Sequence, residues 1–313
     1  MRVLVVGAGA SIEEAKRANV PEELWPPNMV NFAKKMWDSP PLQFFNYWLP
    51  DYLIDQGIQP GSDPTSVFIK LASDPNNSIS VERLFEYCWR NKGKNFADDW
   101  ENLIYHGILN PLVFQISRAF YVNGSGVKQL GAGKLVSGNL KNGDLVLNLN
   151  YETLFEIAAT QQGRQLTYIP NQFDGSSILI AKPHGSFNLL ADENKFHFAQ
   201  PDCIGAVASS ANNYRNWRAI VPPRFNKSYA QHGIAKIIFE SVVDYSPNIV
   251  TFWGVGLTDS DTDLLDVYKK WAASAAIIEV INPSDEVAIK AKGIFNRDIR
   301  HCSTIEEWLT HVE

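Results

Sequence analysis

The chain has 313 residues, 45% of them hydrophobic and 20% charged, and a formal net charge of −6. This length is enough to bury the core of one large domain or two smaller ones. The acidic balance argues against non-specific nucleic-acid binding, and no apolar run reaches the ~18 residues of a membrane span. An apolar segment begins at residue 2 without a preceding basic region and cleavage site, so we expect a cytoplasmic protein.

The three cysteines, Cys88, Cys203 and Cys302, lie far apart in the sequence. They cannot form a four-thiolate zinc site within one chain, and they do not indicate a disulfide framework. We expect no metal site, because no histidine and carboxylate cluster of the H-E-x-x-H kind supports one.

The first residues combine an apolar strand with a glycine turn, Arg2-Val-Leu-Val-Val-Gly-Ala-Gly-Ala-Ser11. A strand, a glycine turn and a helix N-terminus together place backbone N–H groups and a positive dipole end in front of a pyrophosphate. Gly7 and Gly9 lack a Cβ, so such a turn can bend tightly and approach phosphate. The motif is G-x-G-x-S, with Ile12 where a third glycine would stand, and by itself it equally fits an ordinary α/β turn.

A helical pattern without a clear strand fills residues 41–125. Ser80 is expected to cap a helix that runs from Val81 to Trp89. Pro111 should kink or divide a longer helical pattern between Phe96 and Tyr121. An aromatic cluster over Phe44–Tyr52 indicates internal packing, with an oligomer interface as the alternative.

From about Val127 onward, short apolar runs alternate with helical stretches. Runs of this kind are typical of strands covered on both faces, and their alternation with helices indicates a parallel sheet with right-handed crossovers. The expected strands are Val3–Val6, Leu145–Leu149, Leu166–Ile169, Ile178–Ala181, Ala219–Val221, Ile249–Trp253 and Ile277–Ile281. We therefore predict an α/β fold, a doubly wound Rossmann-like parallel sheet formed by residues 1–40 and 126–313, with residues 41–125 as an inserted all-helical subdomain.

Two polar segments directly follow expected strands, where open α/β sheets bind their ligands. In Asn148-Leu-Asn-Tyr-Glu152, the amide of Asn150 could hold a ribose hydroxyl or a water, or it could cap the next helix. In Lys182-Pro-His-Gly-Ser186, His184 is a candidate general base, although a single histidine at a strand end is more often structural.

Two further segments lie at the carboxyl ends of later expected strands. Trp253-Gly-Val-Gly-Leu-Thr-Asp-Ser-Asp261 repeats the glycine turn, with Ser260 or Asp261 as the expected helix cap. In Val280-Ile-Asn-Pro283, Asn282 could contact an adenosine, or Asn-Pro could be an ordinary turn. Arg224 is a possible phosphate ligand, with a surface salt bridge as the alternative.

These five segments, in this order, resemble the sirtuin-like family. Its members share a Rossmann-type NAD-binding domain that is opened by G-A-G-x-S and followed by N-Y-D or N-x-D, H-G, G-x-S/G and a late asparagine. The matching pieces here are Gly7-Ala-Gly-Ala-Ser11, Asn150-Tyr-Glu152, His184-Gly-Ser186, Gly254-Val-Gly256 and Asn282-Pro283. The resemblance covers the sheet domain and not the helical part.

The chain departs from the family in two places. Glu152 stands where the family usually has aspartate, and the four-cysteine zinc module of the deacetylases is missing. The sequence therefore resembles the bacterial branch without zinc that hydrolyses NAD, often as an effector of anti-phage defence.

The resemblance also implies residue roles. Asn150 would hold the attacking water or the ribose hydroxyls, and His184 would be the general base. The pyrophosphate would lie against Gly7, Ala8, Gly9 and Ser11, and the adenosine side would be lined by Gly254, Gly256 and Asn282. Glu152 would assist within the NAD site. NAD is then the substrate.

Other functions remain open from the sequence. The chain could bind NAD or ADP-ribose as a regulatory subunit, or be active only with a partner such as an ATPase or an Argonaute-like protein. It could also act as a homo-oligomer, or, less in keeping with its cysteines, as a deacylase without zinc. The presence of both Asn150 and His184 favours an enzyme, because binding alone does not need a base.

Overall fold

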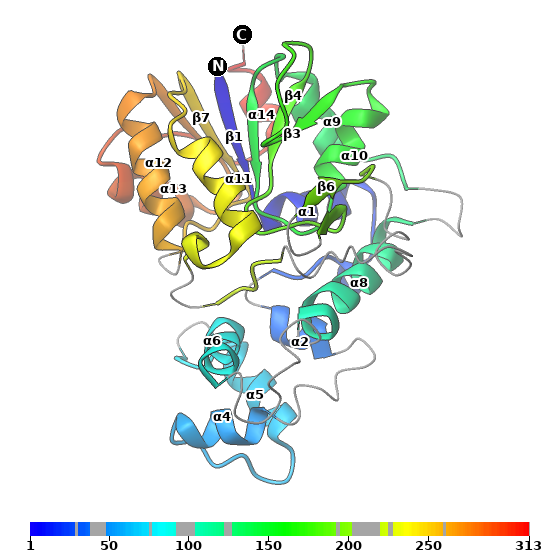
Figure 1. Ribbon diagram of the computed structural model, residues 1–313, viewed down its shortest axis with the longest axis vertical. Helices are drawn as coiled ribbons and strands as arrows, with labels where there is room; N and C mark the ends of the chain where they lie inside the picture. Colours follow the sequence, from blue (N-terminus) through cyan, green and yellow to red (C-terminus); the bar gives the residue numbers. More distant parts are fainter. Residues whose placement is uncertain are drawn as a thin grey trace.

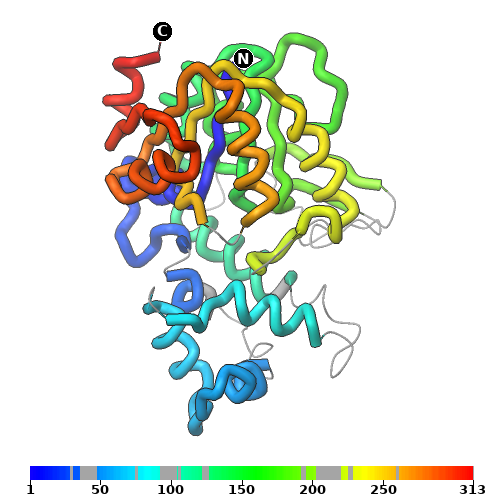
Figure 2. Tube along the Cα trace, turned by 90° about the vertical axis from the view of Figure 1, so that its left-hand side faces the viewer, coloured from blue at the N-terminus to red at the C-terminus, as the bar shows by residue number. Residues whose placement is uncertain are grey.

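The computed structural model describes residues 1–28, 31–37, 48–74, 77–91, 104–121, 127–191, 195–201, 220–224, 228–258 and 261–312. A layered sheet domain forms one end of the molecule, and the helical segment that follows the first βα unit forms the other (Figures 1 and 2). None of the helices in these ranges is both long and apolar enough to cross a bilayer.

The sheet has seven strands in the order β3-β4-β2-β1-β7-β8-β9, and all neighbours are parallel. The strands are β1 (Arg2–Val6), β2 (Leu145–Asn148), β3 (Leu166–Tyr168), β4 (Ile178–Ala181), β7 (Ile249–Trp253), β8 (Ile277–Ile281) and β9 (Arg300–Cys302). β1 lies between β2 and β7, so the chain turns to opposite sides of β1 at the centre of the sheet. The predicted α/β fold with a parallel sheet is confirmed.

Helices cover both faces of the sheet. Val3 and Val5 of β1 belong to a core with α11 (Gly233–Val243), α12 (Thr262–Ser274) and α13 (Asp285–Phe295). The alternate residues Leu4 and Val6 belong to a core with α1 (Ala8–Arg17), α9 (Gly131–Gly138), α10 (Leu154–Gln161) and α14 (Ile305–Leu309). Because successive side chains of a strand point to opposite faces, a wholly apolar strand can serve two cores.

The strand predictions fail at three places. Ile220 and Val221 lie outside any strand, and Ala219 lies outside the described residues. Two prolines follow Val221, and proline cannot donate a ladder hydrogen bond. The structure adds β9, a short edge strand of mostly polar residues, and an antiparallel pair formed by β5 (Leu189–Ala191) and β6 (Phe196–Phe198), which the apolar pattern did not indicate.

The described part of the segment between β1 and β2 contains helices and no strand. Between α1 and α9 these helices are η1 (Glu22–Leu24), α2 (Phe32–Trp37), α4 (Leu49–Asp55), α5 (Pro64–Ala72), α6 (Val81–Asn91), the π-helical turn η2 (Tyr105–Leu109) and α8 (Asn110–Phe120). Their core includes Leu154 and Ile157 of α10, so the helical segment packs directly on the sheet domain.

Two local predictions in this segment are confirmed. The amide of Arg83 donates to Ser80 Oγ at 3.2 Å, which caps α6. Pro111 lies in the first turn of α8, where the helical path is divided from η2. Trp48 and Tyr52 of the expected aromatic cluster are buried, whereas Phe44 lies outside the described residues.

Candidate functional site

A cavity of about 510 Å³ opens at the carboxyl edge of the parallel sheet. It is lined by every residue predicted for the site, namely Gly7, Ala8, Gly9, Ser11, Asn150, Glu152, His184, Gly254, Gly256 and Asn282. The segments that carry them follow β1, β2, β4, β7 and β8. The structure therefore brings together residues that are up to 275 positions apart in sequence (7 to 282).

The helical segment supplies another wall of the same cavity. Phe32, Glu82, Leu112 and Ile116 line it, together with the Pro26-Pro27-Asn28 stretch that follows η1. The sequence motifs indicated none of these residues. The side chains of Phe32, Leu112 and Ile116 give the cavity an apolar surface on which a flat ring can lie.

The two glycine turns contact each other through their backbones. The amide of Gly7 donates to Trp253 O at 3.0 Å, and that of Gly9 donates to Gly254 O at 2.9 Å. A Cβ on Gly7 would lie 2.6 Å from Gly254 O, and one on Gly9 would lie 2.8 Å from Gly254 Cα. Gly7 has a φ of −121°, which any residue adopts. The glycines are thus required for packing between two turns, a different reason from the predicted phosphate approach.

This contact limits how the first turn can bind an anion. The Gly9 amide is used by Gly254 O, and the Ala10 amide donates to Gly7 O at 3.0 Å. Ser11 is 5% exposed, and its hydroxyl donates to Glu152 Oε1 at 2.5 Å. The expected phosphate contacts of Gly9 and Ser11 therefore do not involve the Gly9 amide proton or the Ser11 hydroxyl proton. An anion can still be bound by the N-terminus of α1 at Ala8, because the helix dipole is positive there.

Asn150 is held by its amide nitrogen. Nδ2 donates to Glu152 Oε1 at 2.8 Å, and lies 3.1 Å from both Gly7 O and Ser11 Oγ. With these contacts made by the nitrogen, the oxygen Oδ1 is the atom that the side chain offers to a ligand. Asn150 does not cap α10, since the cap position is Thr153 and the amide of Leu154 donates to Glu152 Oε2 at 2.5 Å.

Glu152 connects three parts of the site. Its Oε1 accepts from Ser11 and Asn150, and its Oε2 accepts from the first amide of α10. The extra methylene relative to aspartate lets one carboxylate reach both α1 and the start of α10. Through these hydrogen bonds Glu152 orders the side chains of Asn150 and Ser11.

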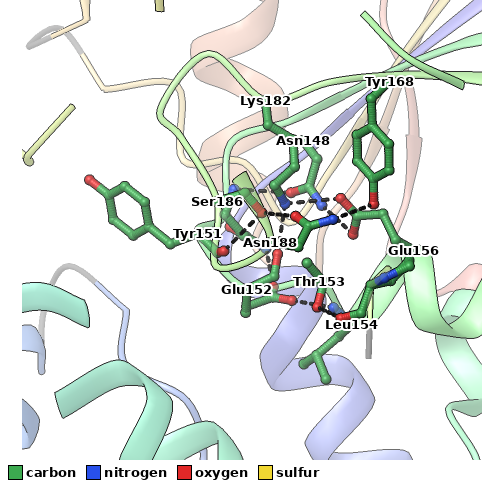
Figure 3. Close-up of polar contacts among 12 residues, drawn as sticks. Asn148, Tyr151, Glu152, Thr153, Leu154, Glu156, Tyr168, Lys182, Ser186 and Asn188 are labelled. Atoms are coloured by element: carbon green, nitrogen blue, oxygen red, sulfur yellow. Dashed lines mark hydrogen bonds and ion pairs between the residues drawn. The ribbon is translucent and has the colours of Figure 1, made fainter. Parts of the chain in front are cut away.

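A buried polar network lies directly beneath this loop (Figure 3). Lys182 Nζ donates to Glu156 Oε1 at 2.9 Å and to Glu152 O at 2.7 Å. Glu156 Oε2 accepts from Asn148 Nδ2 at 3.0 Å, and Asn148 Oδ1 accepts from the Asn150 amide at 3.0 Å. Burial raises the pKa of Glu156, while the charge of Lys182 opposes that shift. This network fixes the backbone on both sides of Asn150.

His184 follows β4 and is held at both ring nitrogens. Nδ1 lies 2.9 Å from Leu149 O, and Nε2 lies 2.6 Å from the hydroxyl of Tyr229 and 3.3 Å from Asp261 Oδ2. Its side chain is 12% exposed, and that of Asp261 is 11% exposed. The imidazole is therefore ordered, and it lines the cavity.

Asp261 lies at the start of α12, as predicted, but its side chain has another role. It occupies the N-cap position of α12, but its side chain makes no capping hydrogen bond. Oδ2 instead contacts His184, and it accepts from the Tyr229 hydroxyl at 3.2 Å. Ser260, the alternative cap, lies outside the described residues. Tyr229, in the short helix η5 (Tyr229–Gln231), was missed because no local pattern marks it.

The remaining predicted residues are less specific. Asn282 lines the cavity, and its Oδ1 accepts from the Ser284 amide at 3.0 Å, the geometry of an ordinary Asx turn. Of the two alternatives predicted for Arg224, the structure shows the salt bridge, with Glu86 as its partner, but the pair is buried and not at the surface. Arg224 is 2% exposed and outside the cavity lining, with its guanidinium 4.3 Å from the ring centre of Trp89 and 3.4 Å from Glu86. Arg224 therefore connects the segment after Val221 to α6.

The ionisable side chains that line the cavity are mainly acidic. Its described lining includes three carboxylates, from Glu82, Glu152 and Asp261, and no lysine or arginine. An anionic group here depends on backbone dipoles, whereas a cationic group is favoured by nearby carboxylates.

Comparison of the sequence with models of known protein families gives no match, and comparison with curated proteins gives none either. The function is therefore argued from the geometry of the cavity and from the motif resemblance.

Proposed function

We propose that the chain is an NAD glycohydrolase that cleaves NAD to nicotinamide and ADP-ribose. The observation that carries the proposal is the convergence of Asn150, His184 and the N-terminus of α1 on one cavity at the carboxyl edge of the sheet. A parallel sheet of this type binds dinucleotides at that edge, beside the strand where the chain changes direction. The motif resemblance predicts the same residues.

The chemistry of the cavity suits this substrate. Its 510 Å³ volume falls within the ~300–1,000 Å³ of small-molecule sites. The N-terminus of α1 favours a pyrophosphate. The carboxylates of Asp261 and Glu82 favour the positive charge of a pyridinium and of the oxocarbenium-like state that follows its departure. Phe32 and Leu112 offer an apolar surface to a planar ring.

In the proposed reaction, the bond between ribose C1′ and the nicotinamide nitrogen breaks, and its electron pair leaves with nicotinamide. The leaving group becomes neutral, so no general acid is needed. A water attacks C1′ and its proton passes to His184, which gives ADP-ribose and nicotinamide. Asn150 Oδ1 would hold the water or a ribose hydroxyl in line with the breaking bond.

Turnover of NAD by the purified chain tests this function, with nicotinamide and ADP-ribose quantified together. We expect equal release of the two products. His184→Ala should reduce the rate by about 10²–10⁴-fold, as for loss of a general base, and Asn150→Ala should also abolish most turnover. His197→Ala, at the exposed central position of β6, and Asn139→Ala, on the surface after α9, are matched controls. Full activity of the His184 variant would refute its role as base.

A regulatory, NAD-binding subunit is the second candidate. It needs no proton acceptor, and the contacts of His184 Nε2 with Tyr229 and Asp261 would then serve only to order the cavity wall. Saturable NAD binding in calorimetry without product release would support this candidate, including a form activated by a partner such as an ATPase or an Argonaute-like protein.

The motif resemblance also leads us to propose a cytoplasmic role in anti-phage defence by NAD depletion. Expression of the active chain should then lower cellular NAD during infection. The His184→Ala chain should leave the NAD level unchanged, and an equal fall with both chains would refute this role.

A further inference from the structure

The contacts of His184 define its tautomer. A backbone carbonyl can only accept a hydrogen bond, so Nδ1, at 2.9 Å from Leu149 O, carries a proton. In the neutral ring, Nε2 is then the basic atom. Nε2 is the nitrogen that faces the Tyr229 hydroxyl and Asp261.

Tyr229 is fixed as a hydrogen-bond donor with two acceptors. Its ring is fully buried and stacks on Phe239 with the ring centres 4.5 Å apart. Burial raises the pKa of Tyr229 well above its usual value, so the hydroxyl keeps its proton at neutral pH. That proton can be donated to His184 Nε2 at 2.6 Å or to Asp261 Oδ2 at 3.2 Å.

Asp261 is held close to both partners at the start of α12. Its side chain makes no capping bond, and Oδ2 lies 3.3 Å from His184 Nε2. A carboxylate at this distance stabilises a protonated imidazole and does little for a neutral one. The side chains of His184, Tyr229 and Asp261 therefore contact one another pairwise, and the hydroxyl proton of Tyr229 can point to either of the other two.

We propose that Tyr229 and Asp261 are positioning residues that hold His184 Nε2 as the proton-accepting atom of the site. The inference rests on the proposed function for its role in catalysis. Before reaction, the Tyr229 hydroxyl donates to Nε2. When the attacking water gives its proton to Nε2, the hydroxyl turns to Asp261 and the new imidazolium N–H faces the same carboxylate. No proton leaves Tyr229, and the water proton ends on His184.

Other titratable groups surround these three side chains. Those nearest to His184 or lining the same cavity are Asp261, Tyr229, Tyr151, Tyr268, Glu82 and Glu152. Burial raises the pKa of Tyr151 and of Tyr268, so both stay neutral. Glu152 is bonded to Ser11 and Asn150, which leaves Asp261 as the carboxylate in contact with the imidazole.

An NMR titration of the histidine rings in the full chain tests this inference without turnover. His184→Gln identifies the His184 signal by its loss. In Asp261→Asn the midpoint should move to lower pH by about one unit or more, because the imidazolium loses its carboxylate. In Tyr229→Phe it should move to higher pH, because neutral Nε2 loses its donor. Asp266→Asn, on the exposed side of α12, should leave it unchanged.

The pH dependence of NAD turnover is a second measurement, made on the same Asp261 and Tyr229 variants. The acid limb of kcat/KM should move with the NMR midpoint in each case. Unmoved midpoints in both variants, with native circular dichroism, would overturn the inference even if the chain hydrolyses NAD. Moved midpoints without any NAD turnover would instead refute the proposed function and leave the arrangement of His184 intact.

Discussion

Replacement of Lys182 by methionine should strongly destabilise the protein. Lys182 and Glu156 both have fully buried side chains, and their charged atoms lie 2.9 Å apart. Methionine fills a similar volume but leaves the Glu156 carboxylate buried without its cation. Loss of one partner of a buried pair typically costs about 3–5 kcal/mol. Lys182 also donates to Glu152 O, so the loop that carries Asn150 loses a support.

The cost should depend on pH in a defined direction. Burial already raises the pKa of Glu156, and removal of Lys182 raises it further. A carboxyl whose pKa is higher in the folded state binds its proton more tightly there. Its contribution to stability is therefore largest at low pH and is lost as the pH rises through the folded pKa. The deficit of Lys182→Met relative to wild type should be smaller at pH 5 than at pH 8.

Urea unfolding followed by tryptophan fluorescence at these two pH values is the appropriate assay. Glu156→Gln should also destabilise the protein, since it leaves the ammonium of Lys182 buried without its carboxylate. Lys236→Met removes an exposed i,i+4 pair and should change stability by less than about 0.5 kcal/mol. A loss below about 1 kcal/mol for Lys182→Met, or a deficit that grows toward pH 5, would refute the reasoning.

Two further predictions follow from packing and burial. Gly254→Ala should lower the free energy of unfolding by about 2–5 kcal/mol, because φ is +64° and a Cβ would lie 2.2 Å from a backbone nitrogen of α1. Gly61→Ala is the control, since Gly61 has a φ of +65° but lies in open space, and it should lower the free energy of unfolding by only about 1–2 kcal/mol in the same urea unfolding experiment. Equal losses in the two variants would contradict the packing argument. Native protein at pH 8 should react with a disulfide reagent at no more than one of its three thiols. Cys88 and Cys302 are buried, and burial raises the pKa of Cys88 and raises that of Cys302 to about 11, whereas Cys203 lies outside the described residues. Two fast-reacting thiols would contradict this prediction.

The location of the site could be predicted because parallel strands end at a common edge. The segments after Val6, Leu147, Ala181 and Trp253 therefore had to meet once the strands were recognised. Apolar runs of four or five residues were sufficient for this step. They were not sufficient for β9, which has three residues and pairs along one side only.

The partners of the site residues could not be predicted. Asp261 stands where sequence favours a helix cap, and only the tertiary structure directs it to His184. Tyr229 reaches the imidazole from a separate short helix 45 positions away. The carboxylate of Glu152 could be recognised as part of a motif, but its contacts with two helices depend on the packing of α1 and α10 against α9.

The contact between the two glycine turns has an evolutionary consequence. Gly7 and Gly9 are separated from Gly254 by nearly the whole chain, yet each leaves room for the backbone of the other turn. A side chain gained at one of these positions would have to be answered by a backbone shift at the other. Among relatives of this chain, these glycines should therefore be inherited as a single unit, including in proteins that have lost His184.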